Sequence, residues 1–354
     1  MIICRHLSRI IKKKHMFYKQ AIISTFLFLF LFLVNESNSA EFFQTKSISV
    51  FNNGPVLNLF NFSRPDIIEN QEQDSTSLNT QFELSNYISS SNKNGDQFYI
   101  DGESWAIRNT LSYQLTQNFI VSASIPWIKH SGGRSDNLIY KFHDILQLPQ
   151  NGRRANNEND FRWILIKDGE TLLDINNEHS AWGDLSITGQ LTPQNTPSVR
   201  WSFMTKFPTG DYDKQTGSDK FDFGLSIAQI NPDWFKNRSS LSQINLAFWY
   251  GSGVSYIGEV SALKKLNQKP FIFTFRTGLA YSPINSWQLK CQLDAQSPLY
   301  NTDIRELGWY PVQISLSTMH KISSKTNFEF VIMEDIRPRS VSDVVFQTSL
   351  QTTF

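Results

Sequence analysis

The strongest restriction on the fold of this chain is a series of short segments in which apolar and polar residues alternate. In "WQLKCQLDAQ" (287–296) every odd-numbered residue is apolar and every even-numbered residue is polar. The segments "VRWSFMTKF" (199–207) and "FIFTFRTGLAY" (271–281) follow the same pattern, with Arg or Lys on the polar face. Successive side chains of a strand point to opposite faces, so each segment predicts a strand with one apolar and one polar face.

About twelve such segments can be counted, and an even number is typical of bacterial outer-membrane barrels. They are centred on residues 82–88, 105–115, 119–127, 182–191, 198–207, 220–229, 241–250, 271–281, 287–296, 310–320, 326–334 and 343–354. Short turns alternate with long polar loops, as they do between the periplasmic and outer ends of such barrels. We therefore predict an all-β, transmembrane, antiparallel up-and-down β-barrel of about 12 strands, with 14 strands as the alternative.

Aromatic residues favour the barrel over a soluble β-sandwich, which also alternates but needs no aromatic residues at its strand ends. The predicted strand directions place two groups at opposite ends, Trp105, Trp127 and Tyr310 at the outer end and Tyr113, Tyr281 and Trp287 at the periplasmic end. Two aromatic girdles of this kind mark the two membrane interfaces of a barrel.

The first forty residues predict export from the cytoplasm. Six basic residues precede the apolar run "AIISTFLFLFLFLV" (21–34), and "NESNSA" follows it, which is the order of a signal peptide with cleavage near Ala40. An uncleaved anchor is the alternative, but the run is shorter than the roughly 20 residues of a spanning helix. We predict a signal peptide at 1–40, a periplasmic or lumenal segment at 41–80, and an outer-membrane barrel at 81–354.

The composition of the remaining chain excludes some partners. Removal of residues 1–40 leaves 27 basic and 31 acidic residues, and a net negative charge disfavours nucleic acid as a partner. Cys291 is then the single cysteine, so no internal disulfide can form. The expected partners are outer-membrane lipid and lipopolysaccharide, the outer-membrane assembly machinery and a small solute, and no cofactor is expected.

The chain ends on an alternating strand, "VVFQTSLQTTF", whose last residue is Phe354. A barrel in lipid must pair its first and last strands, because an open edge would leave backbone groups unsatisfied. We expect this strand to close the sheet against the strand at 82–88. A terminal Phe with apolar residues at alternate positions, here Phe346, Leu350 and Phe354, also resembles the signal that outer-membrane proteins present to their assembly machinery.

The polar faces of the predicted strands place ionisable side chains in one interior. The lumen-facing set is Arg108, Arg200, Lys206, Asp222, Arg276, Lys290, Asp294 and Glu329. These side chains can plug the lumen with mutual salt bridges or line a path for a solute, and a twelve-stranded barrel is of a size that permits either. The turn-rich segment 41–80 is a candidate plug.

The longest loop contains "SDNLIYKFHDILQLPQNGRR" (135–154), which has helical spacing of its apolar residues. Asp136 is a suitable N-cap and Pro149 ends the pattern. His143 and Asp144 lie on the predicted helix and Arg153 follows it. The helix could constrict the lumen, lie on the barrel rim or dip into the membrane interface.

Three stretches of this chain resemble a known family. They are "FHDILQLPQNGRR" in the long loop, "KFPTGDYDKQTGSDKFDFG" at a hairpin (206–224) and "EDIRPRSVSDVVF" before the last strand (334–346). They resemble the uncharacterised Gram-negative outer-membrane barrels called domain of unknown function 3187, which are similar in pattern to putative phenol-degradation-associated channels. The resemblance covers most of residues 80–354 and implies a barrel in the outer membrane.

Two other sites were considered from the residues. In "KHSGGRS", His130 and Ser131 are adjacent and would point to opposite faces of a strand. This prevents the hydrogen bond by which a histidine activates a serine nucleophile. His130 and Ser135 remain a possible pair. The hairpin loop offers carboxylates, Asp211, Asp213, Asp219 and Asp222, but their spacing fits no defined cation loop. We predict no enzyme activity and no metal site. The predicted function is passive passage or binding of a small solute; a structural or adhesive barrel is the alternative, and a lipid hydrolase comes third.

Overall fold

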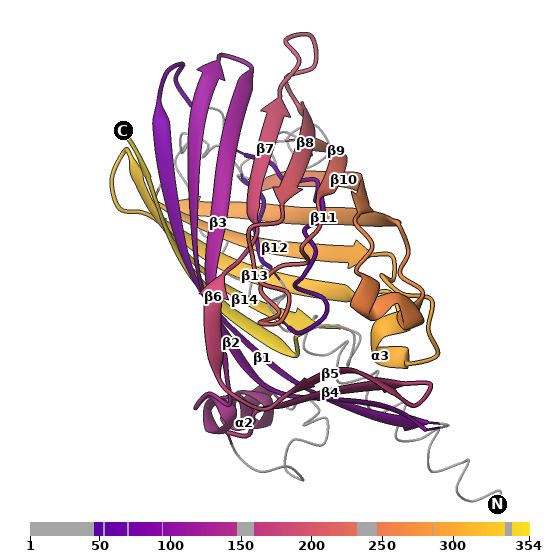
Figure 1. Cartoon of the computed structure of the whole chain (residues 1–354). Coiled ribbons are helices and arrows are strands. Elements are labelled where there is room, and N and C mark those ends of the chain that lie inside the picture. Colours follow the sequence, from indigo (N-terminus) through magenta and orange to yellow (C-terminus); the bar gives the residue numbers. More distant parts are fainter. Residues whose placement is uncertain are drawn as a thin grey trace, which may run out of the picture.

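The structure is a computed structural model, and it describes residues 46–51, 54–68, 71–93, 95–146, 159–231, 246–284, 286–336 and 342–354. The predicted signal peptide and Arg153 lie outside these residues. Figure 1 shows a single antiparallel sheet that curves round and closes on itself. A segment from the N-terminal part of the chain runs through its interior (Figure 1).

Twelve strand positions make up the wall, and the predicted number is confirmed. Ten positions are single strands, and neighbouring positions follow the order of the sequence. At the eleventh position β6 and β7 lie one after the other along β3. The twelfth position is β2, which continues beyond the wall. The strands are β1 (Thr76–Lys93), β2 (Asp96–Thr116), β3 (Phe119–Ser131), β4 (Arg162–Lys167), β5 (Glu170–Ile175), β6 (His179–Trp182), β7 (Leu185–Leu191), β8 (Val199–Phe207), β9 (Asp222–Asn231), β10 (Leu246–Ile257), β11 (Phe271–Ile284), β12 (Trp287–Gln296), β13 (Val312–Lys321), β14 (Thr326–Asp335) and β15 (Val344–Thr353).

The first and last strands close the barrel, as expected. β1 pairs with β15 from Ser77 opposite Thr353 to Asn86 opposite Val344. The backbone N–H of Phe354 then donates to Thr76 O at 2.8 Å. Because β1 begins before residue 82, Phe354 lies beside Thr76 and not beside the 82–88 stretch that the sequence predicted.

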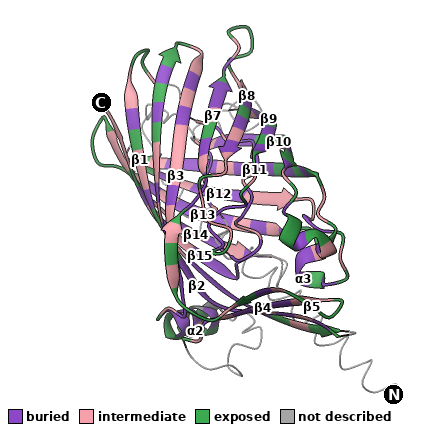
Figure 2. Ribbon diagram, in the orientation of Figure 1, coloured by how far each residue is buried: buried purple, intermediate pink, exposed green. Residues whose placement is uncertain are grey.

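Apolar side chains cover the outside of the wall, while small and polar side chains point inwards. Buried and more exposed residues accordingly alternate along the strands in Figure 2. On β9, for example, Phe223, Leu225 and Ile227 are exposed, and the intervening residues are buried. This is the reverse of a soluble protein, and it suits a wall surrounded by hydrocarbon. Of the predicted girdle residues, Tyr281 is buried and therefore does not belong to an exposed girdle.

Strand limits differ from the prediction in two regions. The β1–β2 hairpin continues as far as the pair Lys93–Asp96, and β4 and β5 extend the sheet from the outer part of β2. β10 spans Leu246–Ile257 instead of 241–250, so it includes Gly251 and Gly253, which the sequence assigned to a loop. Glycine disfavours strands on its own, and its place here depends on packing described below.

Helices are short and lie at the outer end of the barrel, opposite the C-terminus (Figure 1). They are α2 (Asp136–Leu146), α3 (Arg305–Gly308) and the 3₁₀ helix η2 (Ser261–Leu266). The predicted loop helix is thus confirmed as α2. Among the described residues, none of the helices has the length and apolar character needed to cross a membrane.

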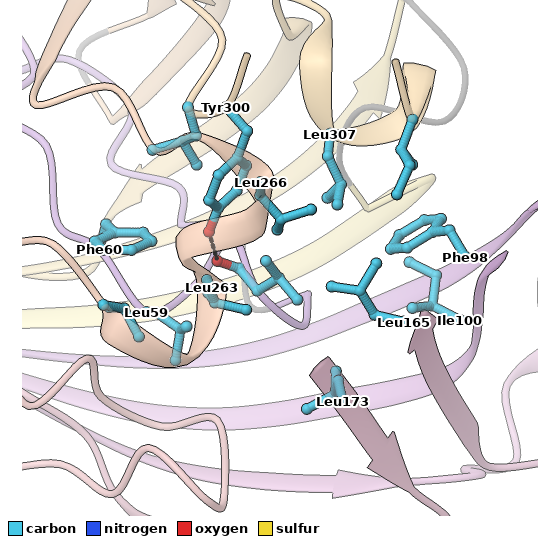
Figure 3. Packing of buried hydrophobic residues seen from close by; sticks show 14 of the residues in the cluster. Leu59, Phe60, Phe98, Ile100, Leu165, Leu173, Leu263, Leu266, Tyr300 and Leu307 are labelled. Atoms are coloured by element: carbon cyan, nitrogen blue, oxygen red, sulfur yellow. Dashed lines mark hydrogen bonds between the residues drawn. The ribbon is translucent and has the colours of Figure 1, made fainter. Parts of the chain in front are cut away.

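A hydrophobic cluster, here called the outer cap, fills the outer mouth (Figure 3). It joins Phe98 and Leu165 of the β2–β4 extension to Leu263 of η2 and Leu307 of α3. Leu59 of the N-terminal segment packs into the same cluster, and Tyr300 donates from its hydroxyl to Val56 O at 3.4 Å. The outer end of the lumen is therefore covered by a packed apolar layer.

Candidate functional site in the barrel lumen

Residues 46–51 and 54–68, here called the lumenal segment, lie inside the barrel. The N–H of Ile48 donates to the Gln292 side chain, whose amide donates back to Ile48 O, both at 2.8 Å. The segment reaches the outer cap at Leu59 and returns, so that the N–H of Ser47 donates to Ile67 O at 3.2 Å. Its backbone groups are thus satisfied by inward-facing wall residues and by its own second pass.

Three glycines of the wall allow the returning pass to approach β9 and β10 closely. A Cβ atom on Gly224 would lie 2.4 Å from Ser63 Cβ, and one on Gly253 would lie 2.3 Å from Ser63 O. A Cβ atom on Gly251 would lie 2.5 Å from Pro65 Cβ. Any larger residue would therefore collide with the segment, which explains why glycines occur in the interior of these strands.

Buried ion pairs and hydrogen bonds fasten the segment to β8 and β11, the strands on either side of β9 and β10. Arg276 of β11 is fully buried and donates to Asp66 of the segment and to Asp294 of β12, the latter at 2.6 Å. Lys206 of β8 donates to Leu59 O at 3.0 Å and to Asp184 at 2.5 Å. A buried charge without such partners would be strongly destabilising, so these contacts hold the segment and the wall together.

A third pair lies between β12 and β14. Lys290 Nζ is 3.0 Å from Glu329 Oε1, and Lys46 of the segment lies 3.7 Å from the other oxygen of the same carboxylate. Ser317 also donates to Glu329 at 2.7 Å. One carboxylate here faces two cations.

Of the three remaining residues predicted to face the lumen, Asp222 and Arg108 lie beside the lumenal segment and Arg200 does not. Asp222 is fully buried and lies 3.2 Å from Lys206, and it also accepts the N–H of Asn61 at 3.2 Å. Arg108 is buried on β2, with its guanidinium carbon 3.6 Å from the centre of the Phe51 ring. Arg200 differs, because its guanidinium donates to Pro197 O and Val199 O of its own turn, away from the other seven.

Two adjoining cavities remain between the lumenal segment and the wall. The inner cavity has a volume of about 160 Å³, and the outer cavity has a volume of about 50 Å³. Phe51, Asn61, Arg64 and Ser186 line both, so the two spaces meet at these residues. The inner cavity is lined by eight hydroxyl side chains of β1, β2, β3, β7 and β8, namely Ser77, Thr110, Ser112, Ser122, Ser124, Ser186, Thr188 and Ser202.

These hydroxyl groups are paired across the wall and still face the cavity. Ser112 and Ser122 share a hydrogen bond of 2.7 Å, and Thr110 donates to Ser124 at 2.9 Å. A hydroxyl group has one donor and two acceptor positions, so each can also bind water or a solute. A hydroxyl-lined space therefore remains between the segment and β1, β2, β3, β7 and β8, although Gln81 of β1 and Gln190 of β7 also donate to the segment backbone.

The loop helix lies on the barrel rim, which was one of the three places considered. His143 is buried, and its Nε2 atom is 3.5 Å from Glu334 Oε1 of β14. Asp144 is exposed, as are Leu138 and Ile145. The helix thus does not constrict the lumen.

The proposed His130–Ser135 pair is not formed. His130 Nδ1 lies 2.6 Å from Ser104 Oγ of the neighbouring strand, and its Nε2 is 3.4 Å from a backbone carbonyl, Gln215 O. Ser135 instead donates to the buried Glu103. Both His130 and Ser104 are fully buried, and in the described part of the chain the imidazole Nε2 meets a backbone carbonyl and not a carboxylate. The pair therefore differs from the accessible, acid-oriented pair of a serine hydrolase.

No group of three or more His, Cys, Asp or Glu side chains among the described residues is arranged to hold a metal ion. The hairpin carboxylates considered as cation ligands are directed to different partners, since Asp222 points into the lumen at Lys206. Asp211 instead caps its own turn, accepting the N–H of Lys214 at 3.1 Å.

A partly buried ion cluster fastens the β4–β5 hairpin at the outer end of the barrel. Lys167 donates to Asp96 at 2.6 Å and to Asp303 at 2.8 Å. The hydrogen bond from Lys167 lowers the pKa of each carboxyl group below its ordinary value, and these two carboxylates in turn raise the pKa of Lys167. The cluster connects the β1–β2 hairpin, the β4–β5 hairpin and the loop before α3.

Comparison with known proteins places the chain in a family. A family model described as "Protein of unknown function (DUF3187)" matches residues 23–354. The chain belongs to this family. The predicted resemblance is therefore confirmed, whereas a comparison with curated proteins gives no match.

Solved structures that resemble this member of the family are channels and porins. The COG4313 outer membrane channel from Pseudomonas putida F1 is 12% identical and aligns over 80% of this chain and 97% of its own, with a TM-score of 0.52. The NanC porin is 7% identical over 78% of this chain and 98% of its own, with a TM-score of 0.43. The CymD monoaromatic hydrocarbon channel is 11% identical over 80% of this chain and 89% of its own, with a TM-score of 0.39. The first of these supports the fold, which is that of an outer-membrane barrel.

Proposed function

We propose that this protein is a passive channel of the outer membrane for a small polar solute. The observation that carries the proposal is the hydroxyl-lined cavity inside a barrel whose outer surface is apolar. Such a cavity offers weak, replaceable hydrogen bonds along a path, and weak binding at several positions is what conduction requires. The likeness in fold to an outer-membrane channel supports the same function.

The lumenal segment and the outer cap narrow this path, so passage depends on movement of one of them. The proposal includes export with cleavage near Ala40 and contact with outer-membrane lipid, lipopolysaccharide and the assembly machinery. It also includes the absence of enzyme activity, which the inaccessible His130–Ser104 pair supports. Phe346 and Leu350 of β15 and Phe354, which follows the strand, occupy alternate positions and are proposed as the assembly signal.

Single-channel recording tests the proposal. The refolded mature protein, added to a planar lipid bilayer in potassium chloride, should give discrete conductance steps. The unheated protein should also migrate faster than the boiled protein on a denaturing gel, which shows that the barrel in the bilayer is folded. Folded protein that inserts and never conducts would favour the alternative of a structural barrel.

A further inference from the structure

The charged side chains that line the lumen are unevenly paired. Lys206 has two carboxylates within 3.2 Å, Asp184 and Asp222, and Arg276 also has two, Asp66 and Asp294. The two arginines Arg108 and Arg64 are less closely paired. Within the described lumen, Arg108 has one carboxylate, Glu83, at 3.8 Å. Arg64 donates to a backbone carbonyl, Val50 O, and the carboxylates that act on it, Asp66, Asp294 and Glu83, lie beyond salt-bridge distance.

Arg108 is buried without a full set of partners. Its Nε atom is 3.8 Å from Glu83 Oε1, which is too long for a hydrogen bond, and this nitrogen has no hydrogen-bond partner among the described residues. The side chain is only 7% exposed. A buried guanidinium with free donors is costly unless it faces water or an anion.

The free side of Arg108 faces the outer cavity. Arg108, Arg64 and Lys206 line this cavity together with one carboxylate, Asp184. Both oxygens of Asp184 are already occupied, by Lys206 Nζ at 2.5 Å and by the N–H of Gly210 at 2.7 Å. Among the described residues that line this cavity, three are cationic and one is acidic, and the acidic side chain is turned to other donors.

Phe51 of the lumenal segment lies at the boundary between the two cavities. Its ring centre is 3.6 Å from the guanidinium carbon of Arg108 and 5.5 Å from that of Arg64. The ring holds the two cations close together despite their mutual repulsion, through cation–π attraction. An anion that enters the outer cavity would meet both guanidinium groups.

We propose that the outer cavity is an anion site, and that Arg108 and Arg64 bind the carboxylate of a small solute there. A volume of about 50 Å³ accommodates a group of that size, with the hydroxyl-lined inner cavity beside it for the rest of the molecule. Arginine suits a carboxylate because its planar fork donates two parallel hydrogen bonds. The proposal deepens the proposed function and rests on it for the movement of solute, while the binding of an anion does not require conduction.

The first test measures ion selectivity. Reversal potentials of the refolded full-length mature protein across a potassium acetate gradient should show preference for acetate over potassium. Arg108→Gln should lower the acetate-to-potassium permeability ratio by about fourfold or more, as expected for removal of one charge about 5 Å from the path in a water-like medium. Arg108→Lys, which keeps the charge, should preserve most of the preference.

Arg200→Gln is the matched control, because it removes the same charge from a side chain that bonds its own turn. The selectivity of this variant should equal that of the unaltered protein. A preference for potassium in the unaltered protein, or an equal loss in Arg200→Gln and Arg108→Gln, would overturn the anion site.

The second test locates the anion without conduction. Crystals of the protein soaked in sodium bromide should show an anomalous peak beside the Arg108 guanidinium, and the peak should be absent in Arg108→Gln and present in Arg200→Gln. A silent barrel with this peak would disprove the channel and keep the anion site. A lumen without the peak, or a peak that persists in Arg108→Gln, would disprove the site even if the barrel conducts.

Discussion

Replacement of Gly253 by alanine should release the lumenal segment from the wall. The new methyl carbon would lie 2.3 Å from Ser63 O, and an ordinary contact between carbon and oxygen is about 3.3 Å, so the segment must move by about 1 Å. The same methyl group would lie 2.7 Å from Thr274 Oγ1, which donates to Ser63 O at 2.8 Å. The substitution therefore both crowds the segment and breaks this hydrogen bond.

The expected cost falls on docking of the segment. Overpacking costs about 1–3 kcal/mol, and the lost hydrogen bond adds about 1 kcal/mol. A total of about 2–4 kcal/mol would raise the undocked fraction by a factor of roughly 30 to 1,000. The β10 backbone is not at a positive φ at this position, so the strand itself can accept alanine.

Chymotrypsin cleavage after Phe62 and single-channel conductance measure this release. Phe62 is buried and directly precedes Ser63, so in refolded protein cleavage after Phe62 should be faster, and the mean conductance larger, for Gly253→Ala than for the unaltered chain. Gly189→Ala is the control, because its methyl group would meet the movable ring of Phe203 at 2.6 Å and not the segment. If Gly253→Ala and Gly189→Ala gave the same cleavage rate and the same conductance, the close approach at Gly253 would not hold the segment.

Three further predictions follow from other parts of the barrel. Deletion of Phe354 removes one backbone hydrogen bond, worth about 1 kcal/mol, so the refolded barrel should be only slightly less stable. The amount of heat-modifiable barrel assembled in cells should fall far more, while Thr353→Ala should have almost no effect on assembly. Normal assembly of the deletion variant would contradict the role of Phe354 as an assembly signal. Lys167 depresses the pKa of Asp96 and Asp303, so their stabilisation of the hairpin is present above the ordinary Asp pKa of about 3.9 and is lost as the pH falls through the folded pKa values. Hydrogen exchange at the Leu165 amide, corrected for the intrinsic rate, should therefore accelerate at low pH in the unaltered chain. In Asp96→Asn the corrected exchange rate should change little with pH. An epitope inserted at Gly169 should be labelled on intact cells and one inserted at Asn195 should not, and the reverse labelling would invert the topology.

Much of the wall could be predicted because its strands face two different solvents. Alternation located the strands and the inward face, so that Lys206 and Arg276 were recognised as lumenal candidates before their contacts were known. The β4–β5 hairpin was missed, although "KDGE" between "RWILIK" and "TLLDI" contains the Asp-Gly pair typical of a tight hairpin. That signal could have been found within the long loop.

The outer half of β10 and the contacts of the lumen could not be predicted from local pattern. Gly251 and Gly253 read as a loop because the reason for them is the segment at Ser63–Pro65, almost 190 residues earlier. The partners of Lys206 include a backbone carbonyl, Leu59 O, which no side-chain pattern reveals. Residues 46–68 do not alternate, so their hydrogen bonds to the wall had no local signal.

The docking of the lumenal segment places a constraint on the order in which the barrel can assemble. The segment is made before the wall, yet Lys46 bonds to Gln351, 305 residues later, and Ile48 bonds to Gln292, 244 residues later. Contacts of such separation form late, because a long loop of chain must first be ordered. The lumenal segment must therefore remain without its final partners until the last strands arrive, and closure of β15 against β1 encloses it. A barrel that closes with the segment outside would be complete in its wall and leave Arg276 and Lys206 facing an empty lumen, so closure and docking have to be timed together.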